Sequence, residues 1–114
     1  MDNVTIPDWA KELDCAITVC DADCHIIYMN ERSREINSPE RDIIGHSLLE
    51  YHPQHAVDII NRLLATGGTN CYTIEKKGVH KLIYQSAWRL NGKVAGLVEI
   101  SIVTPTDMPH FVRK

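Results

Sequence analysis

Alternating apolar residues fill the last third of the chain, where they predict three consecutive β-strands. The strands cover residues 71–74, 79–90 and 94–103, which are rich in β-branched and aromatic residues. The links at 76–78 and 91–93 contain Lys, Asn and Gly residues that tolerate a positive φ. Each link therefore predicts a hairpin, and the three strands predict an antiparallel meander.

One face of the long strand at 79–90 is expected to point into the core. Period-two alternation places these residues on it: His80, Leu82, Tyr84, Ser86, Trp88 and Leu90. When buried, the Tyr84 hydroxyl and the Trp88 indole N–H each need a hydrogen-bond partner. A face of this mixed kind suits a sheet bent over an internal pocket.

The earlier part of the chain predicts a further hairpin followed by helices. Two β runs, at 16–20 and 25–29, flank a tight polar turn, and helical segments follow at 31–36 and 41–51. One long helix then begins at His52 and ends in the glycine pair at 67–68. Its apolar stripe comprises Ala56, Ile59, Ile60, Leu63 and Leu64, and helical spacing places His52 and His55 on the same side.

The N-terminal region predicts a short helix with Thr5 as its cap and Leu13 near its end. Such a helix is too short to be stable alone, so its apolar stripe, which includes Trp9, must dock on the outer face of the sheet or on a partner subunit. The chain then divides into a flanking helix (1–14), a central domain (15–104) and a C-terminal tail (105–114).

Composition narrows the class of protein. A chain of 114 residues is expected to form one domain with a core and one small cavity. The net charge is −3 and the Lys and Arg residues are scattered, so nucleic-acid binding by this domain is not expected. No apolar run reaches the roughly 20 residues of a membrane span, and the N-terminus has no signal-peptide pattern. We therefore expect a soluble cytoplasmic protein without a membrane partner.

The four cysteines are expected to be free thiols. Their spacing contains no C-x-x-C pair and matches neither zinc nor iron–sulfur patterns. Cys15 and Cys20 stand in an apolar β run and are expected to be buried. Cys24, which precedes His25 in a turn, is the one weak candidate for metal or redox chemistry.

These elements predict an α+β fold, a five-stranded antiparallel sheet with helices on one face. Several motifs accompany them: Asp-Ala-Asp at 21–23, a strand ending at Asn30, Ile-Ile-Gly at 43–45 before Leu48-Leu49, His52-Pro53, and glycines at 78, 92 and 96. As a set, from 16 to 103, they resemble a PAS domain. Two departures from that family are the Val103-Thr104-Pro105 end of the last strand, in place of an Asp-x-Thr signature, and the absence of a flavin-reactive cysteine between Cys24 and Cys71.

The resemblance implies a sensory module of a signal-transduction protein, including regulators of transcription. In such a module a small molecule or cofactor binds between the long helix and the sheet. The resemblance also implies a homodimer, here through the Trp9 helix and the outer sheet face. One form of this hypothesis is a haem-binding gas or redox sensor with His55 or His52 as the iron ligand, His55 being the first choice and His46 lying behind them. The remaining pocket wall would be formed by Leu82, Tyr84, Trp88, Val98 and Ile100.

Two other hypotheses remain open. A metal-free sensor would hold an organic acid, an aromatic metabolite or a fatty acid against Trp88 and Tyr84, with its polar end fixed by Ser86, Gln85 or Arg89 according to which strand face points inward. A pure interaction module would have a filled core and act as a dimer. Catalysis is not expected, because no hydrolase, phosphate-loop or metalloprotease motif connects the possible reactive residues Ser47, Cys71, His80 and Glu99.

Overall fold

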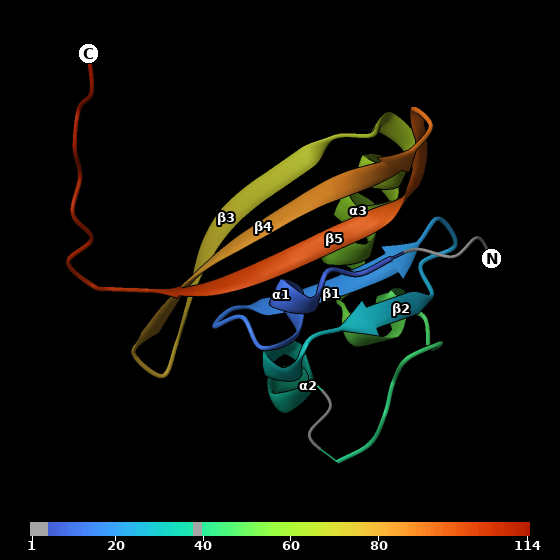
Figure 1. The fold of residues 1–114 in the computed structure, drawn as a ribbon, viewed down its shortest axis with the longest axis horizontal. Coiled ribbons are helices and arrows are strands. Elements are labelled where there is room, and N and C mark those ends of the chain that lie inside the picture. Colours follow the sequence, from blue (N-terminus) through green and yellow to red (C-terminus); the bar gives the residue numbers. More distant parts are fainter. Residues whose placement is uncertain (1–4, 38–39) are drawn as a thin grey trace.

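A computed structural model describes residues 5–37 and 40–114 and shows one five-stranded antiparallel sheet (Figure 1). The strands are β1 (Ala16–Asp21), β2 (Ile26–Met29), β3 (Thr69–Lys76), β4 (Val79–Leu90) and β5 (Lys93–Thr104). Their order in the sheet is β2-β1-β5-β4-β3, so the last strand pairs with the first. The predicted α+β class and the predicted five-stranded antiparallel sheet are confirmed.

Two tight turns close the meander of β3, β4 and β5. Lys77 and Gly78 have φ values of 52° and 78°, and Asn91 and Gly92 have values of 51° and 82°. Positive φ at both central residues is the type I′ pattern, whose twist matches that of the flanking strands. The hairpins predicted at these two links are therefore present.

Within the described residues, four short or medium helices accompany the sheet, namely α1 (Asp8–Lys11), α2 (Glu31–Asn37), the 3-10 helix η1 (Leu48–Tyr51) and α3 (Gln54–Thr66). Two predicted helix starts were wrong. Helix α1 begins after Pro7 without a side-chain cap, so Thr5 does not cap it. Helix α3 begins after Pro53, whose ring suits a helix start, and His52 instead ends η1.

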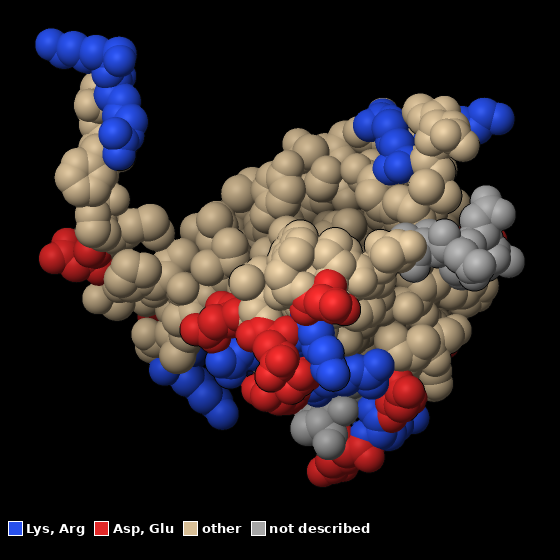
Figure 2. Space-filling view, viewed as in Figure 1, with Lys and Arg blue, Asp and Glu red and all other residues tan. Residues whose placement is uncertain are grey.

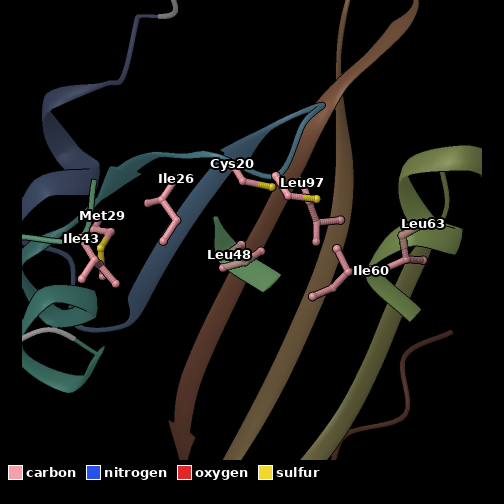
Figure 3. Close-up of a cluster of buried hydrophobic side chains, with 9 residues drawn as sticks. Cys20, Ile26, Met29, Ile43, Leu48, Ile60, Leu63 and Leu97 are labelled. Atoms are coloured by element: carbon pink, nitrogen blue, oxygen red, sulfur yellow. The ribbon is translucent and has the colours of Figure 1, made fainter. Parts of the chain in front are cut away.

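The larger core lies between the sheet and α3, η1 and residues 43–44 (Figure 3). Its fully buried side chains include Ile60 of α3, Leu97 of β5 and Cys20 of β1. Ile26, Met29, Ile43 and Leu48 extend this core towards β2 and η1. The long helix therefore covers the sheet as its apolar stripe predicts.

A second, smaller cluster lies on the opposite face of the sheet, which we call the outer face. There Ala10 of α1 packs with Ile17 and Val19 of β1, and Trp88 and Val98 border them. Ile17 and Val19 alternate with Thr18 and Cys20 along β1, which places the two clusters on opposite faces. The short N-terminal helix thus docks on its own sheet, one of the two placements expected for it.

The face of β4 that was expected to point into the core was the wrong one. Gln85 is 2 % exposed and contacts Glu99, and Ile83 is also buried, so the odd-numbered residues face the helices. Leu82, Tyr84 and Trp88 consequently lie on the outer face. Alternation did not reveal this because both faces of the strand carry apolar residues, the outer one in part for contact with α1.

Candidate functional site

A small cavity of about 110 Å³ lies between the sheet and the segment that runs from α2 to η1. Its apolar wall comes from Ile26, Met29, Ile43 and Leu48. Its polar lining is formed by Thr18, Asn37, Tyr51, His52 and Glu99. We call this the His52–Glu99 cavity.

His52 is held at the cavity wall by contacts to both of its ring nitrogens. Nδ1 lies 2.9 Å from the carbonyl oxygen of Leu48, and Nε2 lies 3.8 Å from Oε2 of Glu99. The Glu99 carboxylate raises the pKa of His52 above its usual 6.5; burial opposes this rise and the Leu48 carbonyl adds to it. In the imidazolium form both N–H groups face an acceptor, which is the physical reason for the raised pKa.

Glu99 occupies the middle of β5 and faces the helices. Its Oε2 accepts a 2.9 Å hydrogen bond from Nε2 of Gln85, and the Oε1 of Gln85 accepts a 3.0 Å bond from Nδ2 of Asn70. Burial alone would raise the pKa of Glu99, but His52 and Gln85 outweigh burial and lower the pKa below its usual 4.5. The carboxylate is therefore ionised at neutral pH.

A second hollow, a groove of about 280 Å³, lies on the far side of Gln85. It is lined by His55, Ala56, Ile59, Asn70, Tyr72 and Gln85. The Asn70–Gln85–Glu99 chain of hydrogen bonds therefore runs from this groove to the His52–Glu99 cavity. His55 is exposed at its rim, so the helix does not bury this histidine as spacing suggested.

The structure separates most of the residues predicted to form the pocket. His52 lines the cavity, His55 lines the groove, and His46 contacts Tyr51. The proposed wall of Leu82, Tyr84, Trp88, Val98 and Ile100 is on the outer face, away from both histidines. That assignment was wrong because it used the inverted face of β4 and the matching face of β5.

Sequence reasoning did not pair Glu99 with His52, and it named Gln85 only as one of three alternatives for fixing the polar end of a ligand. Glu99 and Gln85 are polar residues at facing positions of two neighbouring strands rich in apolar residues. Cross-strand polar pairs of this kind are a signal of a shared environment. The signal becomes visible once the register of β4 against β5 is known.

A haem does not fit the described residues. The cavity beside His52 is smaller than the roughly 300–1,000 Å³ of ordinary small-molecule sites, and a haem is a large ligand within that class. The Nε2 of His52 faces Glu99, so the ring has no open side for a metal in this arrangement. His55 is exposed on an open groove, without the enclosed apolar wall that was expected to accompany it.

The described cysteines do not assemble a reactive centre, whereas Asp21, Asp23 and His25 of the nearby turn bring their side-chain ligand atoms within 4.8 Å of one another. Cys20 is fully buried, and burial raises the pKa of its thiol to about 12, so the thiolate is rare at neutral pH. Cys15 is half-buried, while Cys24 lies in the core and His25 points to solvent beside Asp21. The Cys24–His25 pair is therefore not brought together.

The sequence between residues 11 and 104 matches the family model of the PAS fold. This match covers most of the chain, and we conclude that the protein belongs to the PAS-fold family. The comparison with curated proteins found no match. Among the described residues there is no helix long and apolar enough to cross a membrane.

Solved structures show the same fold at low sequence identity. The PAS domain of a Colwellia psychrerythraea protein superposes with a TM-score of 0.65 and 18% identity, over 84% of this chain and 91% of that one. A sensory box sensor histidine kinase from Vibrio cholerae gives a TM-score of 0.63 and 17% identity, over 82% and 85%. VqmA bound to DPO gives 0.64 and 18%, over 84% of this chain but 54% of VqmA. At these identities the likenesses show that the chain shares the fold of these proteins.

Proposed function

We propose that this chain is a sensory module that binds a small molecule in the His52–Glu99 cavity and passes the occupancy of that cavity to a signalling partner or output domain. The observation that carries the proposal is the half-buried ion pair on the cavity wall. Its role is binding rather than catalysis, because the described residues around it include no paired nucleophile and base.

The ion pair supports a binding role because a pair withdrawn from water is weak evidence for a role in stability alone. Withdrawing two charges from water costs several kcal/mol each, and replacing such a pair by packed apolar residues is often neutral or stabilising. Here the pair borders an apolar wall formed by Ile26, Met29 and Leu48. A few placed polar groups within an apolar lining are typical of small-molecule sites.

The structural neighbours support the same role. One is described as a sensor histidine kinase, and VqmA was solved with DPO bound. Because the sequence identities are low, these neighbours indicate the fold but not the ligand. The ligand class of this chain must be inferred from its own cavity.

A fragment screen by NMR tests the proposal. We expect binding fragments to shift the methyl resonances of Ile26, Met29 and Leu48, and the Leu48→Phe variant to lose these shifts because the larger side chain occupies the cavity. The exposed Leu90→Phe is the matched control and keeps them. Fragments that shift only outer-face residues such as Tyr84 would place binding elsewhere and contradict the proposal.

The outer face supports homodimerisation as a second property of the module. Trp9 is 66% exposed, Tyr84 is 39% exposed and Ile102 is 37% exposed, beside the cluster that holds α1. Figure 2 shows this face with few charges over β4 and β5, whereas acidic and basic side chains gather near α1 and α2. An apolar surface bordered by charge is typical of an interface between subunits.

The haem hypothesis finds no support in the geometry, and one spectrum tests it. After reconstitution with haem we expect no intense Soret band beyond that of free haem, and no difference between the parent chain, His52→Ala and His55→Ala. A Soret band that one of these substitutions shifts would show a haem site.

A further inference from the structure

The Glu99 carboxylate, which belongs to the cavity lining, has one oxygen that is not used by the described residues. Oε2 of Glu99 already faces Gln85 and His52, whereas Oε1 has no hydrogen-bond partner within residues 5–37 and 40–114. A carboxylate has about four acceptor positions, so this oxygen retains full capacity. The deprotonated acid has acceptors and no donor to offer.

The other polar side chains of the lining are already paired with protein groups. The hydroxyls of Thr18 and Ser33 lie 2.5 Å apart, and Nδ2 of Asn37 donates to the same Ser33 hydroxyl at 3.3 Å. The Tyr51 hydroxyl contacts Nδ1 of His46 at 3.2 Å. Because its free oxygen belongs to an ionised carboxylate, Glu99 offers the strongest acceptor for orienting a ligand.

The volume of the His52–Glu99 cavity limits its ligand to a compact molecule. An apolar cavity of roughly 150 Å³ accommodates benzene, and a water molecule occupies roughly 30 Å³ of the liquid. The volume here is about 110 Å³, which suits a five-membered ring or a group of similar size. Ile26, Met29 and Leu48 supply the apolar contacts for its carbon atoms.

We infer that the His52–Glu99 cavity selects a compact, uncharged or cationic ligand that carries an N–H donor, such as a small nitrogen heterocycle, and that this N–H donates to Oε1 of Glu99. The inference rests on the proposed function and narrows its ligand class. Small carboxylic acids, one of the classes expected from the sequence, are disfavoured because their carboxylate meets the Glu99 carboxylate in a confined site.

A matched pair of five-membered rings tests the donor. Pyrazole has an N–H group, whereas isoxazole has the same number of ring atoms, is also neutral at pH 7 and lacks the N–H. A hydrogen bond to a charged group contributes about 1.5–3 kcal/mol, so we expect pyrazole to bind about ten-fold or more tightly than isoxazole. Acetate, which is similarly compact, serves as the anionic probe and is expected not to bind.

The measurement is a titration of the intact 114-residue chain. Methyl shifts give the affinities, and intermolecular NOEs from the pyrazole ring protons to Ile26 and Met29 locate it. The Glu99→Leu variant, of similar side-chain size, is expected to abolish the ten-fold preference, while Glu75→Leu, on an exposed position of β3, is expected to retain it. The comparison of the two rings on the parent chain needs no variant to fold.

The possible outcomes distinguish failure of the donor inference from failure of the proposed function. Equal binding of pyrazole and isoxazole, or binding of acetate, within the cavity overturns the donor inference and leaves the cavity as a ligand site. Absence of any shift at Ile26, Met29 and Leu48, with all three probes and in the fragment screen, overturns the proposed function itself. A preference for pyrazole that survives Glu99→Leu overturns the assignment of Glu99 as the acceptor.

Discussion

Nδ2 of Asn30 donates a 3.0 Å hydrogen bond to the carbonyl oxygen of Ala10, joining the end of β2 to the N-terminal helix. The same nitrogen donates to the Cys15 carbonyl at 2.8 Å, and Oδ1 accepts from the backbone N–H groups of Ile17 and Ser33. This single amide, which is 1% exposed, therefore connects α1, β1 and α2. It links the outer-face helix α1 to α2 through the end of β2.

Replacing Asn30 by Asp tests that link. The carboxylate keeps the acceptor functions but faces the carbonyls of Ala10 and Cys15 without donors, so we expect a loss of about 2–4 kcal/mol in the free energy of unfolding. Urea denaturation measures it. Asn61→Asp on the exposed side of α3 is the matched control and should change stability by less than about 0.5 kcal/mol. Equal stabilities of the two variants would show that the Asn30 amide contributes little.

The pairing of His52 with Glu99 predicts a measurable titration. Because the Glu99 carboxylate is the main cause of the raised pKa of His52, Glu99→Gln should lower that pKa towards 6.5. The histidine ring signals followed by NMR against pH report it. Glu75→Gln removes the carboxylate 3.4 Å from His80 and should leave the titration of His52 in place. An unchanged His52 titration in Glu99→Gln would contradict the assignment.

The same pair makes stability depend on pH with a defined sign. The raised pKa of His52 contributes stability that is fully present below 6.5 and is lost as pH rises through its folded-state value. The lowered pKa of Glu99 contributes stability that is present above 4.5 and is lost as pH falls through its folded-state value. The contribution of the pair to the free energy of unfolding is therefore largest between pH 4.5 and pH 6.5.

Urea unfolding of the parent chain and of His52→Gln measures the first of these contributions. We expect the stability advantage of the parent chain to be constant below pH 6.5 and to shrink as pH rises above it, because the His52 proton is then lost. The same comparison in a Glu99→Gln background is the control and should be nearly flat. If the stability of the parent chain relative to His52→Gln instead increased with pH, the pairing of a His52 imidazolium with Glu99 would be excluded.

The outer face predicts the site of dimerisation. Trp9→Asp and Ile102→Asp each place a charge on the exposed apolar surface and should reduce the mass measured by sedimentation to that of one chain. Ile74→Asp is the control, since Ile74 is similarly exposed at 40% but lies on the helix-facing side of β3. Dissociation by Ile74→Asp, with a stable dimer in the other two variants, would place the interface on the opposite face.

Local rules were sufficient for the turns and for the presence of the strands and the long helix, although they misplaced the first residue of that helix. Lys77-Gly78 and Asn91-Gly92 specify their turns through backbone preferences that act within a few residues. Local rules did not reveal which face of the sheet the helices cover. Both sides of β4 and β5 carry apolar residues, since one meets α3 and the other meets α1, so hydrophobicity did not distinguish the two.

The residues of the candidate site could not be predicted without knowing which face of the sheet the helices cover. His52 was identified because a histidine before a proline at a helix start is conspicuous, but its partner Glu99 is far away in the chain and meets it through the folded topology. His55, chosen with it, is exposed because the turn of α3 that carries it lies at the rim of the groove. The half-buried carboxylate of Glu99 can be located from its register against Gln85, but no sequence feature near His52 indicates it.

The pairing of the first strand with the last has a consequence for synthesis. Until β5 has left the ribosome, β1 has one edge without its neighbour, and the hairpin of β1 and β2 presents apolar side chains such as Ile17 and Val19 to the surroundings. Nascent chains stalled after Leu90 should therefore be cut readily by protease and attract chaperones, whereas chains released beyond Thr104 should resist. The sheet of this domain is therefore complete only after its final strand, β5, has paired with β1.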